Sequence, residues 1–440
     1  MVEVAAAKIL WKLYEWNVAP LCRGVRAFEA RPGLVKRREL GEALLAQLRY
    51  FASRPDCLPE WREAARVGSA EELWRVWTDL PLLTKDVLRD RFAPERLFNE
   101  CRVRGRLDCT GGSTGEPLRF VHDRNMIRAK RAAHMYTRLR MGWRPGMATI
   151  ILWGSDRDIG RGVPLYSRVW RRAVRDFIIA GFAVDERVVE RVVRILDVCR
   201  PVAIYGYTSF LEWLAKASLA AGVAPRAGDV AVAWNGGEVL APEQSDIFRR
   251  AFGVPILNRY GCRELSIIAC QYAPTGPLWV LRPLVFLEVV DDLGRPAGPN
   301  QLGRLICTST ICRGTPFLRY VIGDLGTYGP QDRDQSGIVA LRTVQGRVSG
   351  CIPTFDGKVL SSLFWNHLFK DYPWIQQFQV RWSPTRIRIL FRGEPLPASV
   401  EQETIHKVQR VVGPIPTSLE RVDRLALTPE GKLIHVVREG

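Results

Sequence analysis

The sequence predicts an α/β protein with a large N-terminal domain of mixed, mainly parallel sheets and helices, followed by a small α+β C-terminal domain. Strands alternate with helices between residues 147 and 265, which is typical of a parallel sheet. Strands joined by turns that contain Gly and Pro follow between residues 280 and 345, and a hairpin with a helix stands near the end. The length of 440 residues gives room for two or three domains with buried cores.

Residues 1–80 are expected to be helical. A first helix is indicated by apolar residues at helical spacing, namely Leu10, Leu13, Tyr14 and Val18, and a second helix is expected over residues 38–51. Aromatic residues flank two lysines in the first helix, so peripheral contact with a membrane surface is one interpretation. Packing of this helix on the protein's own core is the alternative that we favour.

The alternating region supplies the expected parallel sheet. Its strands are expected at residues 148–153, 202–207, 230–234 and 254–259. Its helices are expected at residues 185–199, 209–221 and 242–252, the first with apolar residues along one face. Thr208 or Ser209 is expected to cap the second helix, because a hydroxyl there can accept a hydrogen bond from the first helical turn.

The chain is expected to divide into a large domain over residues 1–345 and a small, mobile domain over residues 346–440. The small domain is expected to hold a hairpin with strands at 377–382 and 386–391, followed by a helix at 399–412. The turn of the hairpin is Ser383-Pro384-Thr385. No internal repeat or low-complexity segment interrupts this division.

The net charge of +18 comes mostly from arginine, with 54 Arg against 10 Lys. Such an excess attracts polyanions, and solvated surface guanidiniums are the alternative interpretation. The basic residues are spread along the chain, so we expect no dedicated nucleic-acid site. We expect no transmembrane segment, because no apolar run is long enough. Charged residues interrupt the apolar part of residues 4–18, so this stretch is not typical of a signal peptide and a cytoplasmic location is expected. A homodimer is left open.

The ten cysteines stand at irregular spacing and include no Cys-x-x-Cys pair. Neither a zinc ribbon nor a thioredoxin-like motif is therefore indicated. We expect reduced thiols packed as small apolar side chains. A structural metal held by Cys270, Cys307 and Cys312 is left open as the less favoured alternative.

The stretch from Thr110 to Pro117 is the most informative motif of the chain. It contains three glycines, two threonines and a serine among eight residues, and Gly permits the turns that aim several N–H groups at an anion. Its flanks are typical of strands, so we expect a loop between two strands. It lacks the Gly-Lys-Ser/Thr ending of a P-loop. Taken alone, such a stretch is more often only a turn.

Further short motifs follow in a recognisable order. They are Trp234-Asn235-Gly236-Gly237-Glu238, Arg259-Tyr260-Gly261-Cys262-Arg263-Glu264, Arg319-Tyr320-Val321-Ile322-Gly323-Asp324-Leu325, Gly346-Arg347 and Thr428-Pro429-Glu430-Gly431-Lys432. Together with the Gly-rich stretch and residues 80–85, they make the chain resemble the adenylate-forming enzymes, in particular the phenylacetate–CoA ligase/CapK-like branch. The resemblance spans roughly residues 75–435.

The resemblance implies an ATP-dependent, AMP-forming carboxylate ligase that makes an acyl-adenylate and then transfers the acyl group. It implies ATP, Mg²⁺ and coenzyme A, with an amine or sugar amine as the alternative acceptor and a carrier thiol as a weaker one. The substrate is expected to be a small carboxylic acid, aromatic or otherwise apolar, with Trp234 and Tyr207 as candidate pocket walls. The alternative from another class is a catalytically weak scaffold protein in polysaccharide biosynthesis.

The resemblance also assigns roles to residues. It assigns the phosphates to the loop residues Thr110, Gly111, Gly112, Ser113, Thr114 and Gly115, and the adenine slot to Gly236, Gly237, Glu238, Tyr260 and Gly261. Glu264 is implied as the Mg²⁺ ligand, Asp324 as the acceptor for the ribose hydroxyls, and Arg347 as a contact to the ribose or α-phosphate. Lys432 is implied as the catalytic lysine, which stabilises charge as the carboxylate attacks the α-phosphate.

Each assignment has a plainer alternative. Asp324 could be an ordinary turn aspartate, Glu264 a helix-start carboxylate and Tyr260 a core side chain, while Arg347 and Lys432 could be solvated charges. The chain also departs from the family, since Val348-Ser349-Gly350 replaces acidic hinge residues and Trp279 stands where some relatives have a metal-binding His. The altered hinge puts the second, acyl-transfer step in doubt.

Overall fold

A computed structural model describes most of the chain. The described residues are 18–110, 117–153, 171, 174–180, 186–223, 225–238, 240, 242–345, 352–353, 359–360, 362–369, 372, 374–426 and 436–439. None of the helices within these ranges is both long enough and apolar enough to cross a membrane.

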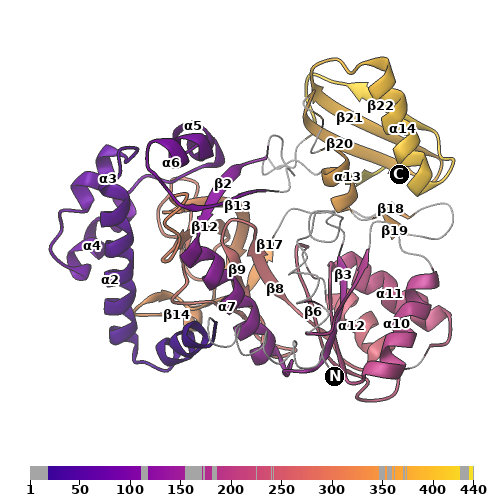
Figure 1. The fold of residues 1–440 in the computed structure, drawn as a ribbon, viewed down its shortest axis with the longest axis horizontal. Coiled ribbons are helices and arrows are strands. Elements are labelled where there is room, and N and C mark those ends of the chain that lie inside the picture. The colour runs from indigo at the N-terminus through magenta and orange to yellow at the C-terminus, as the bar shows by residue number, and fades with distance from the viewer. Residues whose placement is uncertain are drawn as a thin grey trace.

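The N-terminal part is helical, as expected, and forms one side of the molecule (Figure 1). Residues 18–29 are helical, and five α-helices and a short 3₁₀ helix follow: α2 Gly33–Ala52, α3 Pro59–Ala64, α4 Ala70–Val76, η1 Trp77–Asp79, α5 Lys85–Arg91 and α6 Pro94–Asn99. The helix expected over 38–51 therefore begins earlier, directly after Pro32. Its buried face carries Leu40, Leu44, Leu48 and Phe51 at helical spacing. The expected helix around Leu10, Leu13 and Tyr14 lies outside the described residues.

A two-stranded sheet and a long helix follow. β1 Gly105–Cys109 pairs antiparallel with β2 Arg119–Asp123, and α7 Arg124–Met141 begins directly after β2. The Asp123 carboxylate caps α7 by accepting a hydrogen bond from the Met126 N–H at 3.1 Å. Gly142 ends the helix at φ +113°, a left-handed conformation that glycine adopts readily.

The expected parallel sheet is confirmed, with the strand order β4-β3-β5-β6-β7. Its strands are β3 Ala148–Trp153, β4 Asp176–Ala180, β5 Val202–Gly206, β6 Val230–Asn235 and β7 Ile256–Leu257. Its helices are α10 Glu186–Cys199, α11 Thr208–Ala220 and α12 Pro242–Phe252. The strands are apolar nearly throughout, which fits a sheet buried on both faces.

Two expectations in this region were wrong. The strand expected over 254–259 is divided, because β7 ends at Leu257 and Arg259 already belongs to an antiparallel sheet. The cap position of α11 is not at Thr208 or Ser209, because the helix already begins at Thr208. Tyr207 occupies the cap position without a side-chain hydrogen bond. The Thr208 hydroxyl instead accepts a hydrogen bond from the buried amide of Asn235.

Two four-stranded antiparallel sheets fill the centre of the large part, with strand orders β16-β10-β9-β8 and β11-β12-β13-β17. The first contains β8 Arg259–Cys262, β9 Ser266–Cys270, β10 Leu278–Val280 and β16 Ala340–Leu341. The second contains β11 Val285–Val290, β12 Gly303–Ser309, β13 Tyr320–Thr327 and β17 Thr343–Gln345. A short 3₁₀ helix and a small hairpin complete this part: η2 Pro330–Asp332, β14 Arg333–Asp334 and β15 Gly337–Ile338.

The C-terminal part has its own apolar core and stands apart from the helical side of the molecule (Figure 1). Its sheet has the order β22-β21-β20-β23. Its elements are β18 Ile352–Pro353, β19 Val359–Leu360, α13 Ser362–Phe369, β20 Ile375–Ser383, β21 Arg386–Gly393, α14 Ala398–Val412, β22 Thr417–Arg421 and β23 Val436–Arg438. The expected hairpin and helix are thus confirmed. The proposed boundary at residue 346 lies outside the described residues and stays a prediction.

Candidate functional site

The Gly-rich stretch connects two strands, as the sequence predicted. Where the stretch begins, Thr110 donates its N–H to the Leu118 carbonyl at 3.0 Å, and the Leu118 N–H returns a hydrogen bond to the Thr110 hydroxyl oxygen at 3.0 Å. These two bonds close the base of the loop. Thr110 therefore has a structural role at the loop base, independent of any ligand. The residues between them, Gly111, Gly112, Ser113, Thr114 and Gly115, lie outside the described residues.

Glu264 lies in the turn between β8 and β9, as expected, and its side chain is buried, with 4% of the residue exposed. The Tyr320 hydroxyl on β13 donates a hydrogen bond to Glu264 Oε1 at 2.8 Å. A hydrogen bond from one hydroxyl leaves a carboxylate with further acceptor capacity. The Tyr320 hydrogen bond therefore orients the Glu264 carboxylate and leaves it able to bind a further partner.

The backbone of the same turn is held by two side chains that follow the Gly-rich loop. His122 Nε2 on β2 lies 2.8 Å from the Glu264 carbonyl oxygen, and Lys130 Nζ on α7 donates to the Arg263 carbonyl at 3.1 Å. Burial, with a smaller effect of Lys130, lowers the pKa of His122 to about 4, so the ring is neutral and donates its Nε2–H. Two successive carbonyls of the turn are therefore fixed from the strand and helix that follow the loop.

Lys130 belongs to a small charged cluster beside this turn. Its Nζ lies 3.7 Å from Asp108 Oδ2, and Arg263 Nη1 lies 3.7 Å from Asp108 Oδ1. Burial lowers the pKa of the Lys130 ammonium, and Asp108 opposes that shift. Asp108 stands on β1 directly before the Gly-rich loop, so the cluster ties the start of the loop to the turn that carries Glu264.

Tyr260 and Asp324, which the resemblance assigns to one nucleotide, are in direct contact. The Tyr260 hydroxyl donates to Asp324 Oδ2 at 2.8 Å. Burial and the neighbouring Asp324 charge raise the pKa of Tyr260, so this hydroxyl stays protonated and donates. The structure therefore brings these two residues together from positions that lie far apart in the sequence.

The two tyrosine–carboxylate contacts form a crossed arrangement. The 260–264 segment offers Tyr260 and Glu264, and β13 offers Tyr320 and Asp324, so each segment supplies one tyrosine and one carboxylate to the other. The spacing is four residues on both sides, as expected for two segments that run in opposite directions. Gly323, at φ +95°, precedes Asp324 in a conformation that glycine adopts readily.

Arg319 anchors β13 from the other side. It is 1% exposed, and its guanidinium donates to the carbonyls of Thr78 and Leu80 and pairs with Glu288, with Nη2 3.1 Å from Oε1. Backbone hydrogen bonds of Arg319 and Val321 to Leu83 attach the same segment. The strand that carries Tyr320 and Asp324 is thus fixed to residues 78–83.

A different construction holds the loop that carries Gly236 and Gly237. The buried Asn235 amide donates to the Thr208 hydroxyl at 2.9 Å and to the Glu238 carbonyl at 3.0 Å, and its oxygen accepts from the Arg259 N–H at 2.8 Å. This one side chain therefore joins the end of β6 to α11 and β8.

The two glycines of this loop lie against aromatic rings. A side chain at Gly236 would meet the Tyr205 hydroxyl at 2.8 Å, and one at Gly237, where φ is +82°, would meet the Tyr207 ring at 2.9 Å. The sequence interpretation explained these glycines by a close approach of adenine. The structure adds a sufficient reason within the protein, namely two tyrosines.

The structure also bears on the assignments of Gly261, Trp234 and Tyr207. At Gly261 a side chain would lie 2.2 Å from the Ser266 carbonyl oxygen, so the pairing of β8 with β9 requires glycine there. Trp234 has no exposed surface and Tyr207 is 3% exposed. Trp234 therefore does not face an open pocket in this structure. Arg347 and Lys432 lie outside the described residues.

The donor set fits a metal ion that arrives with a nucleotide. Within the described ranges, no three His, Cys, Asp or Glu side chains are grouped to hold a metal ion on their own. Cys270, Cys307 and Cys312 are buried free thiols. Mg²⁺ is commonly bound through one or two carboxylates together with substrate phosphates, and the buried Glu264 carboxylate suits that mode.

Sequence reasoning missed His122, Lys130 and Asn235. His122 directly follows the apolar pair Phe120-Val121, which was a usable signal, because a buried imidazole needs a hydrogen-bond partner. Asn235 stands inside a motif that was recognised for its glycines. The signal for Lys130 was weaker, since a lysine on a helix is usually solvated.

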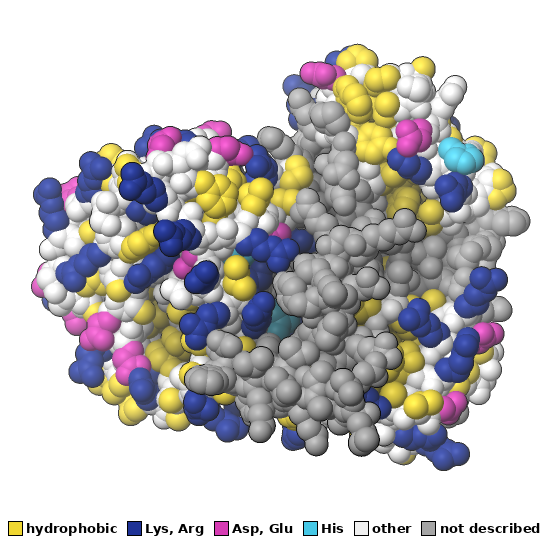
Figure 2. Space-filling view, in the orientation of Figure 1, with side chains coloured by type: hydrophobic (Ala, Val, Ile, Leu, Met, Phe, Trp, Pro, Cys, Tyr) yellow, Lys and Arg dark blue, Asp and Glu magenta, His cyan; other side chains and the backbone are white. Residues whose placement is uncertain are grey.

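On the face drawn in Figure 2, the charged side chains of the described residues are dispersed. Figure 2 shows Lys and Arg spread over the face formed by the helical part, interspersed with acidic and apolar side chains. This distribution agrees with the scattered basic residues of the sequence.

Comparison with solved structures finds proteins of the same fold. A structure of 2-hydroxyisobutyryl-CoA ligase in complex with 2-HIB-AMP and CoA in the thioesterification state gives a TM-score of 0.62, at 19% identity over 93% of this chain and 90% of that chain. The open conformation of that ligase, with the same two ligands, gives 0.57 at 19% identity over 93% and 92%. Neither protein-family models nor curated proteins give a match.

This likeness establishes the fold and nothing finer. The chain shares the fold of this CoA ligase, a large mixed α/β part followed by a smaller C-terminal part. The phenylacetate–CoA ligase/CapK-like branch stays a prediction from the motifs.

Proposed function

We propose that this protein is an ATP-dependent, AMP-forming carboxylate ligase. The observation that carries the proposal is the crossed contact of Tyr260 with Asp324 and of Tyr320 with Glu264. It brings a ribose-binding candidate and a metal-binding candidate from distant motifs onto two adjoining segments, within the fold of adenylate-forming ligases.

In the proposed first step, a carboxylate oxygen attacks the α-phosphorus of ATP and pyrophosphate leaves, which gives an acyl-adenylate. Residues 110–115 would hold the phosphates, and Glu264 would hold Mg²⁺ together with them. The ion neutralises the charge of the leaving group when bound. Asp324 would accept the ribose hydroxyls, Tyr260 and the loop 236–238 would border the adenine, and Arg347 would contact the ribose or α-phosphate.

Lys432 would stabilise the charge on the reacting oxygens, and the proposed domain over residues 346–440 would bring it to the site. In the second step the acyl group passes to an acceptor after that domain rotates. Coenzyme A is the proposed acceptor. An amine is the alternative acceptor. The hinge sequence Val348-Ser349-Gly350 is instead the feature that favours the catalytically weak scaffold protein.

The test is the exchange of labelled pyrophosphate into ATP, with each acid of a broad panel of small aliphatic and aromatic carboxylates added in turn. We expect exchange that depends on one class of acid and that is lost in Glu264→Gln. Consumption of CoA in the same reaction would support the thioester product, whereas exchange without CoA consumption would favour the amide product. If the folded protein gives exchange with none of the acids in the panel, the proposed enzyme activity is overturned and the scaffold interpretation is favoured.

A further inference from the structure

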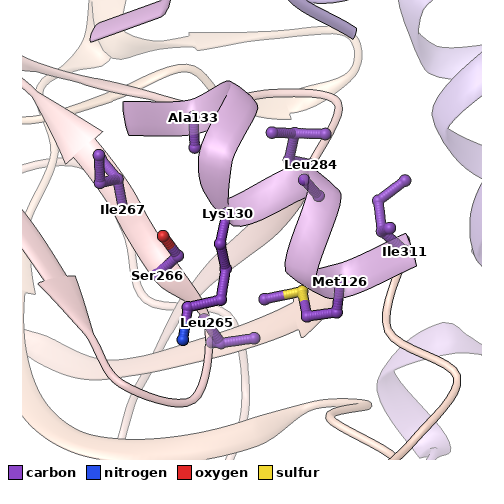
Figure 3. Close-up of a pocket in the computed structure, with 9 residues that line it drawn as sticks. Met126, Lys130, Ala133, Leu265, Ser266, Ile267, Leu284 and Ile311 are labelled. Atoms are coloured by element: carbon purple, nitrogen blue, oxygen red, sulfur yellow. The ribbon is translucent and has the colours of Figure 1, made fainter. Parts of the chain in front are cut away.

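A small cavity lies against α7 (Figure 3). The two residues that follow Glu264 in the chain, Leu265 and Ser266, are part of its wall. The cavity is bordered by α7, by the start of β9 and by two loops. Its volume is about 10 Å³, which is roughly the room that one water molecule requires. Most of its wall is apolar, formed by Met126, Ala129, Ala133, Leu265, Ile267, Leu284 and Ile311.

Two polar side chains interrupt this apolar wall, Ser266 and Lys130. Ser266 is 8% exposed, and among the residues that the structure describes its hydroxyl has no hydrogen-bond partner. A buried hydroxyl without a partner is costly, because it loses its bonds to water and gains none. A ligand that supplied the missing partner would recover that cost.

The backbone at Ser266 is also unusual. Its φ is +67°, a left-handed conformation that residues other than glycine and asparagine seldom adopt. Such conformations persist where the surrounding structure enforces them, and they gather at functional sites. Here the conformation places a strained serine directly after the turn that carries Glu264.

We infer that this cavity receives a small hydroxyl group of the carboxylic acid substrate and that Ser266 hydrogen-bonds it. The inference rests on the proposed function, because the acid must approach the phosphates near Glu264. Lys130 connects the two places: it lines the cavity, and its Nζ donates to the Arg263 carbonyl at the same turn.

The chemistry of the wall selects among acids. The volume excludes an aromatic ring or a second carboxylate from this cavity. An ammonium group would be repelled by Lys130, and a methyl group would fit but leave the Ser266 hydroxyl unsatisfied. A short aliphatic hydroxy acid satisfies all these conditions. This narrows the substrate from the aromatic or small apolar acid that the sequence predicted.

The experiment compares matched acids: propionate against lactate and 3-hydroxypropionate, and butyrate against its 2-hydroxy and 3-hydroxy derivatives. Acid-dependent pyrophosphate exchange gives kcat/KM, and the rise in melting temperature with each acid in the presence of ATP gives binding. We expect one hydroxy acid to exceed its parent acid by at least about tenfold in kcat/KM. The same acid should give the larger thermal shift.

Two substitutions separate recognition from folding. Ser266→Ala keeps the strained backbone and should lower kcat/KM for the preferred hydroxy acid about tenfold. The kcat/KM for the parent acid should stay nearly the same. Ser266→Gly removes the same hydroxyl but relieves the backbone, so it should show the same loss with a higher melting temperature. Ser218→Ala is the matched control, because Ser218 is 1% exposed, also lacks a hydrogen-bond partner for its hydroxyl among the described residues, and lies on α11.

The outcomes distinguish the two proposals. If no acid gives exchange or a thermal shift with the wild-type protein, both fail. In one outcome, acids support pyrophosphate exchange without a higher kcat/KM for any hydroxy acid, and in another the higher kcat/KM survives in Ser266→Ala. In either case the proposed function stands and this inference is overturned, with the cavity left as a site for solvent. Loss of the advantage in both Ser266 variants but not in Ser218→Ala supports it.

Discussion

The turn that carries Glu264 and the loop that carries Gly236 end strands of different sheets, and different interactions hold them. The turn is fixed by the Tyr320 hydroxyl, which donates to the Glu264 carboxylate, and by the neutral His122 ring, which donates to the Glu264 carbonyl. The loop is fixed by one buried amide and by aromatic rings packed against glycines. The first arrangement orients charge and the second defines shape.

The difference suits the two ends of a nucleotide. Phosphates and ribose are recognised through hydrogen bonds and a metal ion, which require oriented donors and carboxylates. A purine is recognised largely by a slot of the right shape. Substitutions around the turn that carries Glu264 should therefore change the reaction rate and its dependence on the metal ion. Substitutions around the loop that carries Gly236 should change protein stability and the affinity for the nucleotide.

The largest expected effect is that of Glu264→Gln. The amide still accepts the Tyr320 hydrogen bond but no longer offers a negative charge to a metal ion. We expect pyrophosphate exchange to fall by about 10³-fold with little change in melting temperature. Glu403→Gln, at an exposed position on α14, is the control and should keep full activity. A loss below about fivefold would exclude Glu264 as the metal ligand.

His122 should give the folded protein a specific dependence on pH. Its pKa is lowered from 6.5 to about 4 in the folded state, so the unfolded state binds the proton more readily between those values. The contribution to the free energy of unfolding is complete above pH 6.5 and is lost as the pH falls towards 4. It amounts to about 3 kcal/mol.

Chemical denaturation at several pH values checks this prediction. His122→Gln keeps an amide donor on the side chain but does not titrate, so its unfolding free energy should fall less steeply below pH 6.5 than that of the wild type. Equal slopes for the two proteins would show that His122 is not held neutral.

Asn235→Ala should destabilise the protein by about 2 kcal/mol, because the Arg259 N–H and the Glu238 carbonyl lose a buried partner. Guanidinium denaturation measures this. Asn99→Ala, exposed at the end of α6, should change stability by less than about 0.5 kcal/mol. If Asn235→Ala instead left stability unchanged and abolished only metal-dependent exchange, the proposed division between the two halves would be wrong.

The smallest expected effects come from substitution of the two tyrosines. The two variants distinguish the proposed ribose-binding role of Asp324 from the proposed metal-binding role of Glu264. Tyr260→Phe should raise the KM for ATP about tenfold, since Asp324 loses its orienting hydrogen bond. Tyr320→Phe should raise the Mg²⁺ concentration needed for half-maximal exchange by a similar factor. Initial rates over ATP and Mg²⁺ series provide both numbers. Identical effects in the two variants would argue against separate roles.

The sequence was sufficient for much of the fold because the relevant signals are local. The strand at 148–153 and the helix at 242–252 match the structure at both ends. The division of 254–259 was missed, since the residue types of this short segment do not show where the chain leaves one sheet and joins another. Which sheet a residue joins is decided by tertiary pairing.

The candidate site was less accessible for the same reason. Motif order indicated Tyr260, Glu264 and Asp324, but their partners depend on how two segments pair across the fold. Glu264 and Tyr320 are 56 residues apart in the chain, and no local pattern specifies such a contact. Ser266 was invisible in the sequence, because its left-handed backbone is enforced by its surroundings.

The attachment of residues 78–83 to β13 has a consequence for biosynthesis. Arg319 stands some 240 positions after Thr78 and Leu80, whose carbonyls it binds. A ribosome that has made only the first three hundred residues therefore carries a chain in which the early segment still lacks its anchor. The large part closes only late in translation. A truncation before residue 319 should leave residues 78–83 unattached, whereas removal of residues 78–83 should release β13.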